Sequence, residues 1–166
     1  FDCCCRTWYL DSCWFSCWNT GFSACRFCRH VGYSPRKRPY HTIIPGMVTQ
    51  GGKLYLSYGV MGGAMQPQGH VQVLLGLVED GLDPQAALDR PRVYLEEGRP
   101  GGEVALEEGI PSSVQSELEA KGHRVYAVTG SDRAVFGRGQ IILRNAETGV
   151  LCGGSDPRAD GCAMGF

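Results

Sequence analysis

Long hydrophobic runs are missing from this sequence of 166 residues. Outside the N-terminal segment, the longest apolar stretch surrounds the letters VQVLLGLV, which is far short of the roughly 20 residues that a membrane-spanning helix needs. We therefore expect no membrane span in this chain. An initiator Met and a basic-then-apolar leader are also missing, since the sequence opens at Phe1 with FDCCCRTWYL. We expect no targeting segment here and interpret the chain as a fragment.

A strong charge of one sign is missing as well. The formal net charge is -1, and the only basic run is RKR at Arg36 to Arg38. Such a chain has no basic patch that would attract a phosphate backbone, so we expect no nucleic-acid partner. Its length suits one domain with a sizeable core.

Cysteine is nearly missing from most of the chain but abundant at its start. Seven of the nine cysteines lie in the first 28 residues, and only Cys152 and Cys162 lie beyond them. The composition of the later part is that of an ordinary globular protein. We therefore divide the chain into a Cys- and Trp-rich segment, residues 1–35, and a globular region, residues 36–166.

Two interpretations of the Cys-rich segment remain open. One is a zinc site, because thiolates two to four residues apart can share a tetrahedral ion; its ligands would be Cys13, Cys17, Cys25 and Cys28, with His30 as a spare. The other, which we prefer, is a shifted reading frame or a misread exon boundary. Cysteine codons read one nucleotide later begin GT or GC, so the CCC run would become Val or Ala, and we therefore assign no metal ligand.

The globular region shows helix and strand periodicities in turn. Residues 53–59 alternate apolar and polar side chains and predict a strand with Leu54, Leu56 and Tyr58 on its buried face. A helix is predicted next, with an apolar stripe that should pack against a sheet. This stripe consists of Val71, Leu74, Leu75 and Val78.

Two short helices and three more strands follow. Asp83 as N-cap, Pro84 as first residue and Pro91 as stop predict a short helix. A second is predicted over 111–121, with Val114 and Leu118 facing the core. Short strands are predicted over 124–128, 140–144 and 149–154. Because strands and helices come in blocks rather than in strict alternation, the pattern favours an α+β fold.

The stretch YGVMGGAMQPQGH places Gly62 and Gly63 between the first strand and the first helix. It contains neither the dinucleotide fingerprint G-x-G-x-x-G nor the phosphate loop G-x-x-x-x-G-K-[ST]. Two interpretations remain: a tight turn that needs glycine backbone angles, or bare N–H groups that stabilise a developing oxyanion.

Several other polar residues have simple structural interpretations. Asp156 fits a Ser-Asp-Pro turn with an Asp-Arg pair, and Gln66 and Gln68 fit capping or turn roles at the helix entrance. The acidic residues Glu96, Glu97, Glu107 and Glu108 are interpreted as a solvated face.

Five stretches together resemble one known family. They are RPYHTIIPGMV, GVMGGAMQPQGHVQVL, DGLDPQAALDRPR, LEAKGH and GGSDPRADGCAMGF. In this order they resemble the C-terminal part of the small subunit of the gamma-glutamyltranspeptidase family, and the RPYHTIIPG form is most similar to its glutathione-hydrolase-like subgroup. The superfamily also includes oxamate amidohydrolase.

The resemblance implies an N-terminal-nucleophile hydrolase with an αββα sandwich, here incomplete and limited to its C-terminal portion. In that family a Thr hydroxyl attacks the amide, its own α-amine acts as base, and an acyl-enzyme forms without a cofactor. A glycine pair matching Gly62 and Gly63 donates the oxyanion hydrogen bonds. Thr42 and His41 stand where many members have a Ser-Ser pair that contacts the substrate carboxylate. The implied substrate is a γ-glutamyl amide or a related small acidic amide such as oxamate.

The chain departs from the family upstream of residue 38. Thr7 and Thr20 are the only threonines before Thr42, and neither has the sequence context of the nucleophile. We therefore expect the isolated chain to be inactive. Its implied partners are a large subunit and the N-terminal part of the small subunit. The alternative is a non-catalytic remnant.

Overall fold

The computed structural model describes residue 36, residues 42–96 and residues 102–165. The chain divides into two compact units, Phe1–Thr42 and Ile43–Phe166, and the second unit contains every described helix and strand. The Cys-rich segment lies outside the described residues. The zinc and reading-frame interpretations, and the boundary near residue 35, therefore stay predictions.

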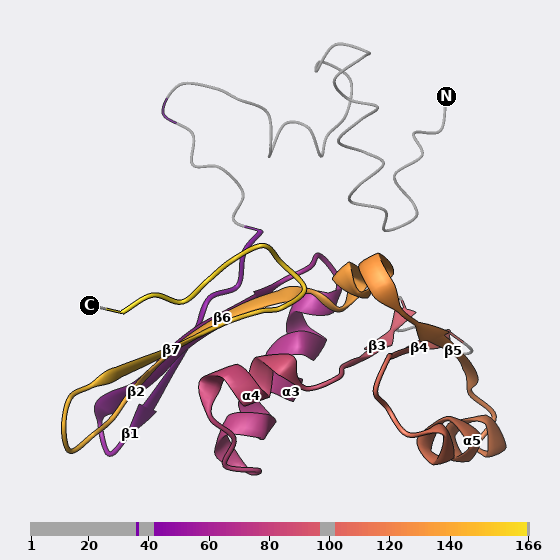
Figure 1. Ribbon diagram of the computed structural model, residues 1–166, viewed down its shortest axis with the longest axis horizontal. Coiled ribbons are helices and arrows are strands. Elements are labelled where there is room, and N and C mark those ends of the chain that lie inside the picture. Colours follow the sequence, from indigo (N-terminus) through magenta and orange to yellow (C-terminus); the bar gives the residue numbers. More distant parts are fainter. Residues whose placement is uncertain (1–35, 37–41, 97–101, 166) are drawn as a thin grey trace. The chain divides into compact units, whose positions relative to one another are not determined.

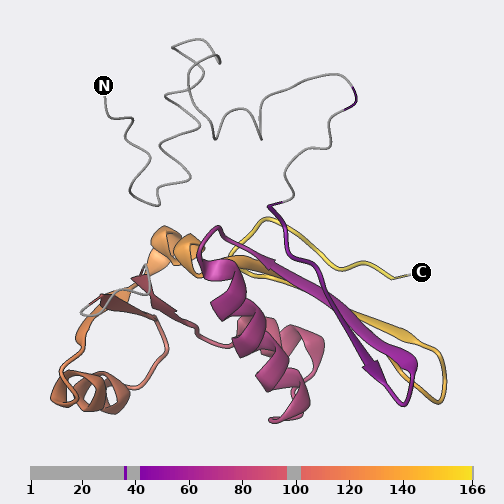
Figure 2. The same ribbon diagram turned by 180° about the vertical axis from the view of Figure 1, so that it is seen from behind.

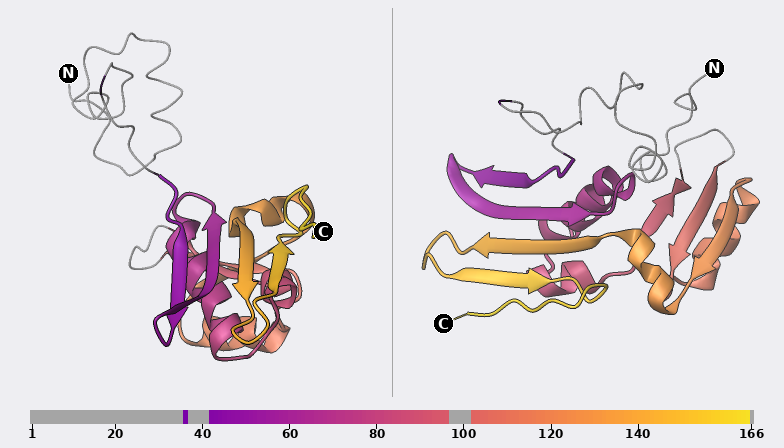
Figure 3. Two further views of the ribbon diagram at one scale, coloured as in Figure 1. Left: turned by 90° about the vertical axis from the view of Figure 1, so that its left-hand side faces the viewer. Right: turned by 90° about the horizontal axis from the view of Figure 1, so that it is seen from above.

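A four-stranded antiparallel sheet forms the larger part of the second unit (Figure 3). Its order is β1 (Gly46–Gln50), β2 (Lys53–Met61), β6 (Arg138–Arg144) and β7 (Leu151–Ser155). Gly51 and Gly52 close the β1–β2 hairpin with φ angles of 57° and 76°, which only glycine and a few polar residues adopt at low cost. The predicted strands over 53–59, 140–144 and 149–154 are confirmed. Leu56 is buried as predicted, but the predicted burial of Leu54 is wrong, because this residue lies next to the β1–β2 hairpin and is 43% exposed.

Two helices cover one face of this sheet (Figure 1). They are α3 (Met65–Val78) and α4 (Pro84–Asp89). The predicted cap of α4 is confirmed, because the Asp83 carboxylate accepts a hydrogen bond from the Ala86 N–H at 2.9 Å. Apolar side chains from both layers form the core: Leu56, Val60, Val73, Leu77, Ala87, Leu88 and Ile141.

The predicted buried stripe of α3 is wrong. Val71, Leu75 and Val78 are 48–56% exposed, and the helix instead buries the face that carries Gly69, Val73, Gly76 and Leu77. The reason is the close approach of helix and sheet: a Cβ on Gly69 would lie 2.7 Å from Val60 Cγ1. Small residues allow this contact, so the bulkier aliphatic side chains turn outward.

A smaller mixed sheet contains β3 (Val93–Leu95), β4 (Glu103–Glu107) and β5 (Arg124–Val128), with β4 antiparallel to β3 and parallel to β5 (Figure 2). Helix α5 (Ser112–Ala120) connects the parallel pair. Its predicted core contacts are wrong, because α5 buries none of its residues and Val114 is 38% exposed. The 3-10 helix η2 (Gly130–Phe136) then leads into β6.

Two glutamine side chains of α3 close the outer edge of β3. The Gln72 amide donates to the Val93 carbonyl and accepts from its N–H, both at 2.8 Å. Gln68 bonds Leu95 in the same way, at 3.0 and 2.8 Å. The amides therefore replace a neighbouring strand on an edge that would otherwise present unpaired backbone groups. The predicted turn or capping role of Gln68 is wrong, because its side chain bonds β3 instead.

The other face of the four-stranded sheet carries exposed apolar side chains. Met47, Ile142 and Leu151 are 53–71% exposed. Helices α3 and α4 lie against the opposite face of this sheet (Figure 3). Within residues 42–96 and 102–165, no helix is both long enough and apolar enough to cross a bilayer.

Candidate active site

The glycine pair, Gly62 and Gly63, forms the turn between β2 and α3. The φ angles are 150° for Gly62 and 56° for Gly63. Both values lie where a Cβ is disfavoured, so the chain needs glycine at both positions. The tight-turn interpretation is therefore correct, and it leaves the oxyanion interpretation open, because the same turn determines where the two N–H groups point.

The carbonyl groups of the pair are occupied by the first turn of α3. Met65 N–H donates to the Gly62 carbonyl at 3.0 Å, and Gln66 N–H donates to the Gly63 carbonyl at 3.1 Å. In a trans peptide the N–H points away from the carbonyl. The Gly63 N–H therefore points away from α3. Within the part of the chain that the structure describes, neither N–H of the pair donates a hydrogen bond.

Gly137, at the end of η2, packs directly on the backbone of this turn. A Cβ on Gly62 would lie 2.9 Å from Gly137 Cα. Conversely, a Cβ on Gly137 would lie 2.6 Å from the Met61 carbonyl oxygen. Two segments far apart in the sequence therefore meet backbone to backbone, in a contact that leaves no room for a side chain.

A charge cluster next to this contact consists of Arg92, Glu107, Arg133, Asp156 and Arg158, and all of these side chains are buried except Arg133, which is 33% exposed. Arg92 Nη2 is 2.7 Å from Asp156 Oδ2, and Arg158 Nη1 is 3.0 Å from Asp156 Oδ1. Glu107 accepts hydrogen bonds from Arg158 and from Arg133, the latter at 2.8 Å. The predicted Asp-Arg pair of the Ser-Asp-Pro turn is confirmed.

Glu107 was expected on a solvated face, and this expectation is wrong. It is 1% exposed, because β4 is buried between its neighbours and the Arg158 and Arg133 side chains neutralise its carboxylate. Glu96 also has a partner, since its carboxylate accepts a hydrogen bond from the Tyr126 hydroxyl at 2.6 Å. Burial and then this hydrogen bond raise the pKa of Tyr126 to about 12.

Opposite charges outweigh burial at both buried carboxylates. Burial alone would raise the pKa of Glu107, but hydrogen bonds from Arg158 and Arg133 lower it below its ordinary value. Burial would likewise raise the pKa of Asp156, yet the positive charge of Arg92 and two backbone N–H donors lower it. Both groups are therefore ionised at neutral pH and act as structural anions.

The charge cluster holds the segment that packs on the glycine pair. Arg92 Nη1 donates to the carbonyls of Phe136 and Gly137 at 3.1 and 3.2 Å. Asp156 Oδ2 accepts from the Gly139 N–H at 2.7 Å. Sequence reasoning missed this role, and the apolar run of residues 104–106 directly before Glu107, typical of a strand buried on both faces, was the signal that could have revealed Glu107.

The other predicted site residues, Thr42 and His41, do not belong to the second unit. Thr42 is exposed and belongs to the first unit, and His41 lies outside the described residues. Their predicted substrate contacts therefore stay predictions. Two residues beyond Thr42, Ile44 N–H donates to Gln66 Oε1 at 3.2 Å, which ties the start of the second unit to the first turn of α3. The Gln66 amide also donates to the Gly63 carbonyl at 3.5 Å, so the predicted helix-entrance role of Gln66 is confirmed.

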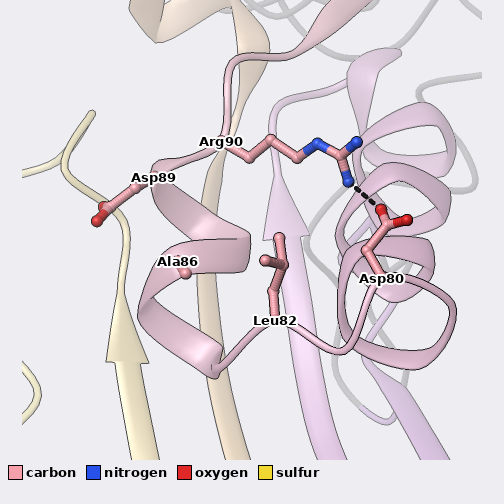
Figure 4. Close-up of a pocket in the computed structure, with 5 residues that line it drawn as sticks. All are labelled: Asp80, Leu82, Ala86, Asp89 and Arg90. Atoms are coloured by element: carbon pink, nitrogen blue, oxygen red, sulfur yellow. Dashed lines mark hydrogen bonds and ion pairs between the residues drawn. The ribbon is translucent and has the colours of Figure 1, made fainter.

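A separate surface hollow of about 520 Å³ lies where α3 connects to α4 (Figure 4). An ion pair between Arg90 and Asp80 borders it. Its lining residues are Asp80, Leu82, Ala86, Asp89 and Arg90, which include no hydroxyl or thiol nucleophile. Among the described residues, no three His, Cys, Asp or Glu side chains gather as a metal site. The glycine pair is therefore the better candidate for chemistry.

Comparison with known proteins identifies the family of the chain. The family model described as gamma-glutamyltranspeptidase matches residues 30–166. The chain belongs to the gamma-glutamyltranspeptidase family. The predicted α+β class and N-terminal-nucleophile hydrolase fold are confirmed, with the chain forming part of that sandwich.

Individual relatives of this gamma-glutamyltranspeptidase family member are longer proteins. A glutathione hydrolase-like YwrD proenzyme of Bacillus subtilis is 37% identical over 136 residues, covering 80% of this chain and 25% of that protein. An oxamate amidohydrolase proenzyme of Klebsiella pneumoniae is 29% identical, covering 82% and 26%. The crystal structure of a cephalosporin acylase from Bacillus halodurans is 44% identical with a TM-score of 0.67, covering 81% and 25%. The chain thus spans about a quarter of the length of these relatives.

Proposed function

We propose that this chain supplies the oxyanion hole of an amidohydrolase that acts through an N-terminal nucleophile. The observation that carries the proposal is the pair of N–H groups on Gly62 and Gly63. They adjoin each other, lack an acceptor among the described residues, and belong to a turn whose carbonyls are already bonded to α3. Preorganised backbone donors of this kind stabilise the negative oxygen of a tetrahedral intermediate.

The proposed reaction uses these two donors. A Thr hydroxyl from the rest of the enzyme attacks the amide carbonyl, and the carbonyl oxygen becomes an anion that accepts hydrogen bonds from the glycine pair. Loss of one such donor raises the barrier by roughly 2.7–4 kcal/mol. The amine then leaves, and water or an acceptor amine releases the acyl group from the Thr oxygen.

The proposed substrate is a γ-glutamyl amide or a related small acidic amide. Relatives include proteins named as a glutathione hydrolase and as an oxamate amidohydrolase, and both names describe small amides that carry a carboxylate. We place Thr42 and His41 at the substrate carboxylate, where the Thr hydroxyl and the imidazole N–H can donate hydrogen bonds.

The proposed partners are a large subunit and the N-terminal part of the small subunit, which would bring the Thr nucleophile. We call this chain together with those parts the complete enzyme. The exposed apolar side chains on the open sheet face, Met47, Ile142 and Leu151, support such a partner, because large apolar side chains gathered on one exposed face often mark an interaction surface.

The test compares the complete enzyme with the 166-residue chain, using γ-glutamyl-p-nitroanilide and oxamate as substrates. We expect turnover of at least one substrate by the complete enzyme and none by the chain. A Thr42→Val variant of the complete enzyme should raise KM several-fold and change kcat little. Turnover by the isolated chain that Thr7→Ala or Thr20→Ala abolishes would contradict the proposal. A complete enzyme inactive on every small acidic amide would identify the chain as a non-catalytic remnant.

A further inference from the structure

We infer that Gly137 is a positioning residue that sets the direction of the Gly62 N–H. The inference rests on the proposed function of the glycine pair as an oxyanion hole. It concerns a position 75 residues further along the chain, in the turn from η2 to β6.

The inference begins from the direction of the peptide group between Met61 and Gly62. A Cβ placed on Gly137 would lie 2.6 Å from the Met61 carbonyl oxygen but 3.6 Å from the Met61 carbonyl carbon. Since the C=O bond is about 1.23 Å long, most of its length points toward Gly137. The Gly62 N–H belongs to the same planar trans peptide and therefore points away from Gly137.

The second step concerns what holds Gly137 in place. Its own φ is 77°, and Arg92 Nη1 binds its carbonyl at 3.2 Å and the Phe136 carbonyl at 3.1 Å. Two residues later, the Gly139 N–H binds Asp156 at 2.7 Å. Arg92 and Asp156 are 1% and 0% exposed, so the surrounding core fixes their positions. Their hydrogen bonds to residues 136–139 therefore hold Gly137 close to Met61.

A methyl group at position 137 must therefore displace the Met61 carbonyl group, which it would contact. Real Cβ atoms do not come within 3.0 Å of backbone oxygen, so the Met61–Gly62 peptide would have to rotate. The Gly62 N–H would then turn away from the oxyanion position. A displacement of about 1 Å can lower a rate by roughly 100-fold.

Gly137→Ala and Gly130→Ala form a matched pair of variants. Gly130 begins the same 3-10 helix and has a φ of 61°, so alanine there is also strained, whereas Gly137, at φ 77° and ψ 174°, adopts angles that are essentially restricted to glycine. A Cβ on Gly130 would meet nothing within 4 Å. Gly130→Ala therefore reports the cost of a positive φ in η2, and the difference between the variants reports the contact with Met61 together with the additional backbone strain at Gly137.

The test measures kcat and KM of the complete enzyme and both variants. We expect Gly137→Ala to lower kcat at least tenfold with KM within about twofold of wild type, because an oxyanion donor acts in the transition state. Gly130→Ala should stay within about twofold in both constants. Equal kcat values for the two variants, or a rise in KM alone, would overturn the inference.

A crystal structure of the wild-type complete enzyme supplies the second measurement, and it decides the matter if Gly137→Ala does not fold. The Met61 carbonyl oxygen should point at Gly137 Cα and lie in van der Waals contact with it. A Met61 carbonyl that points elsewhere would overturn the inference. This measurement separates the two ideas, since a complete enzyme without amidase activity would refute the proposed function while the crystal structure still tests the role of Gly137.

Discussion

Arg92 Nη2 and Asp156 Oδ2 lie 2.7 Å apart in an ion pair whose two side chains are only 2% and 0% exposed. The same carboxylate oxygen also accepts from the Gly139 N–H at 2.7 Å. Removing one charge from such a pair leaves the other buried without compensation, which typically costs roughly 3–5 kcal/mol.

Asp156→Asn should therefore lower the free energy of unfolding of the complete enzyme by about 3 kcal/mol. Asn can accept from Gly139 but brings no charge to Arg92. Asp160→Asn, a change at an exposed aspartate four residues later, is the control and should change stability by less than about 0.5 kcal/mol. Urea denaturation of both variants measures the difference, and equal midpoints would show that the ion pair does not stabilise the fold.

Stability should fall in acid because the pKa values of Glu107 and Asp156 are lowered in the folded state. A lowered folded pKa means that the unfolded chain binds protons first, so the stabilisation is complete above the unfolded pKa of about 4 and is lost as pH falls below it. Thermal melting between about pH 3 and pH 7 should show the decline. Glu107→Gln should flatten it, and a melting temperature independent of pH would refute the linkage.

Gln72→Met should destabilise the fold by about 2 kcal/mol, because it leaves the Val93 N–H and carbonyl without their partners on α3. Methionine keeps the length and helix propensity of glutamine. Gln115→Met on α5 is the control, since Gln115 donates only to the exposed Glu119 carboxylate. Hydrogen exchange at the Val93 amide should accelerate in Gln72→Met alone; unchanged protection would mean that the glutamine does not seal the β3 edge.

The isolated chain should bind a hydrophobic dye and self-associate. Its four-stranded sheet exposes Met47, Ile142 and Leu151 on one face, and apolar sheet surface of this kind promotes aggregation. Dye fluorescence and sedimentation velocity on the chain measure both effects. Reversible, cooperative melting as a monomer would contradict the expectation and would show that the second unit folds without a partner.

The origin of residues 1–35 can be decided at the nucleotide level. We expect a shifted frame across the codons for Phe1 to Pro39 to encode a Val- and Gly-rich stretch that leads back to a Thr nucleophile. Sequencing the locus and translating all three frames tests this. A genuine Cys-rich frame, with stoichiometric zinc in the purified chain, would refute the shifted-frame hypothesis.

Local sequence signals predicted the elements that depend on local chemistry. Asp83 and Pro84 predicted the start of α4, and the alternation around Leu56 predicted β2, because caps and pleats are decided by neighbouring residues. The buried face of α3 could not be predicted in this way. Its contact depends on Val60 approaching Gly69 across the helix–sheet interface, and hydrophobicity alone ranks Val71 and Leu75 above glycine.

In the candidate site too, some residues are revealed by a local sequence signal and others are not. Gly62 and Gly63 could be selected from the sequence because a glycine pair between a strand and a helix is a local signal. Gly137, Arg92 and Glu107 could not, because their roles arise from contacts between segments far apart in the sequence. Glu107 in particular resembles its exposed neighbour Glu108 until β4 pairs with both β3 and β5.

The hydrogen-bond donors at the turn after β2 are main-chain amides, and this limits how the site can change during evolution. Mutation exchanges side chains but leaves the amide in place, so the donors persist through any replacement that preserves the path of the backbone. Under the proposed function, selection for a new acyl group therefore acts on surrounding side chains rather than on these amides. The contact between Gly62 and Gly137 is then the part of the site that tolerates the least variation, although neither residue has a side chain.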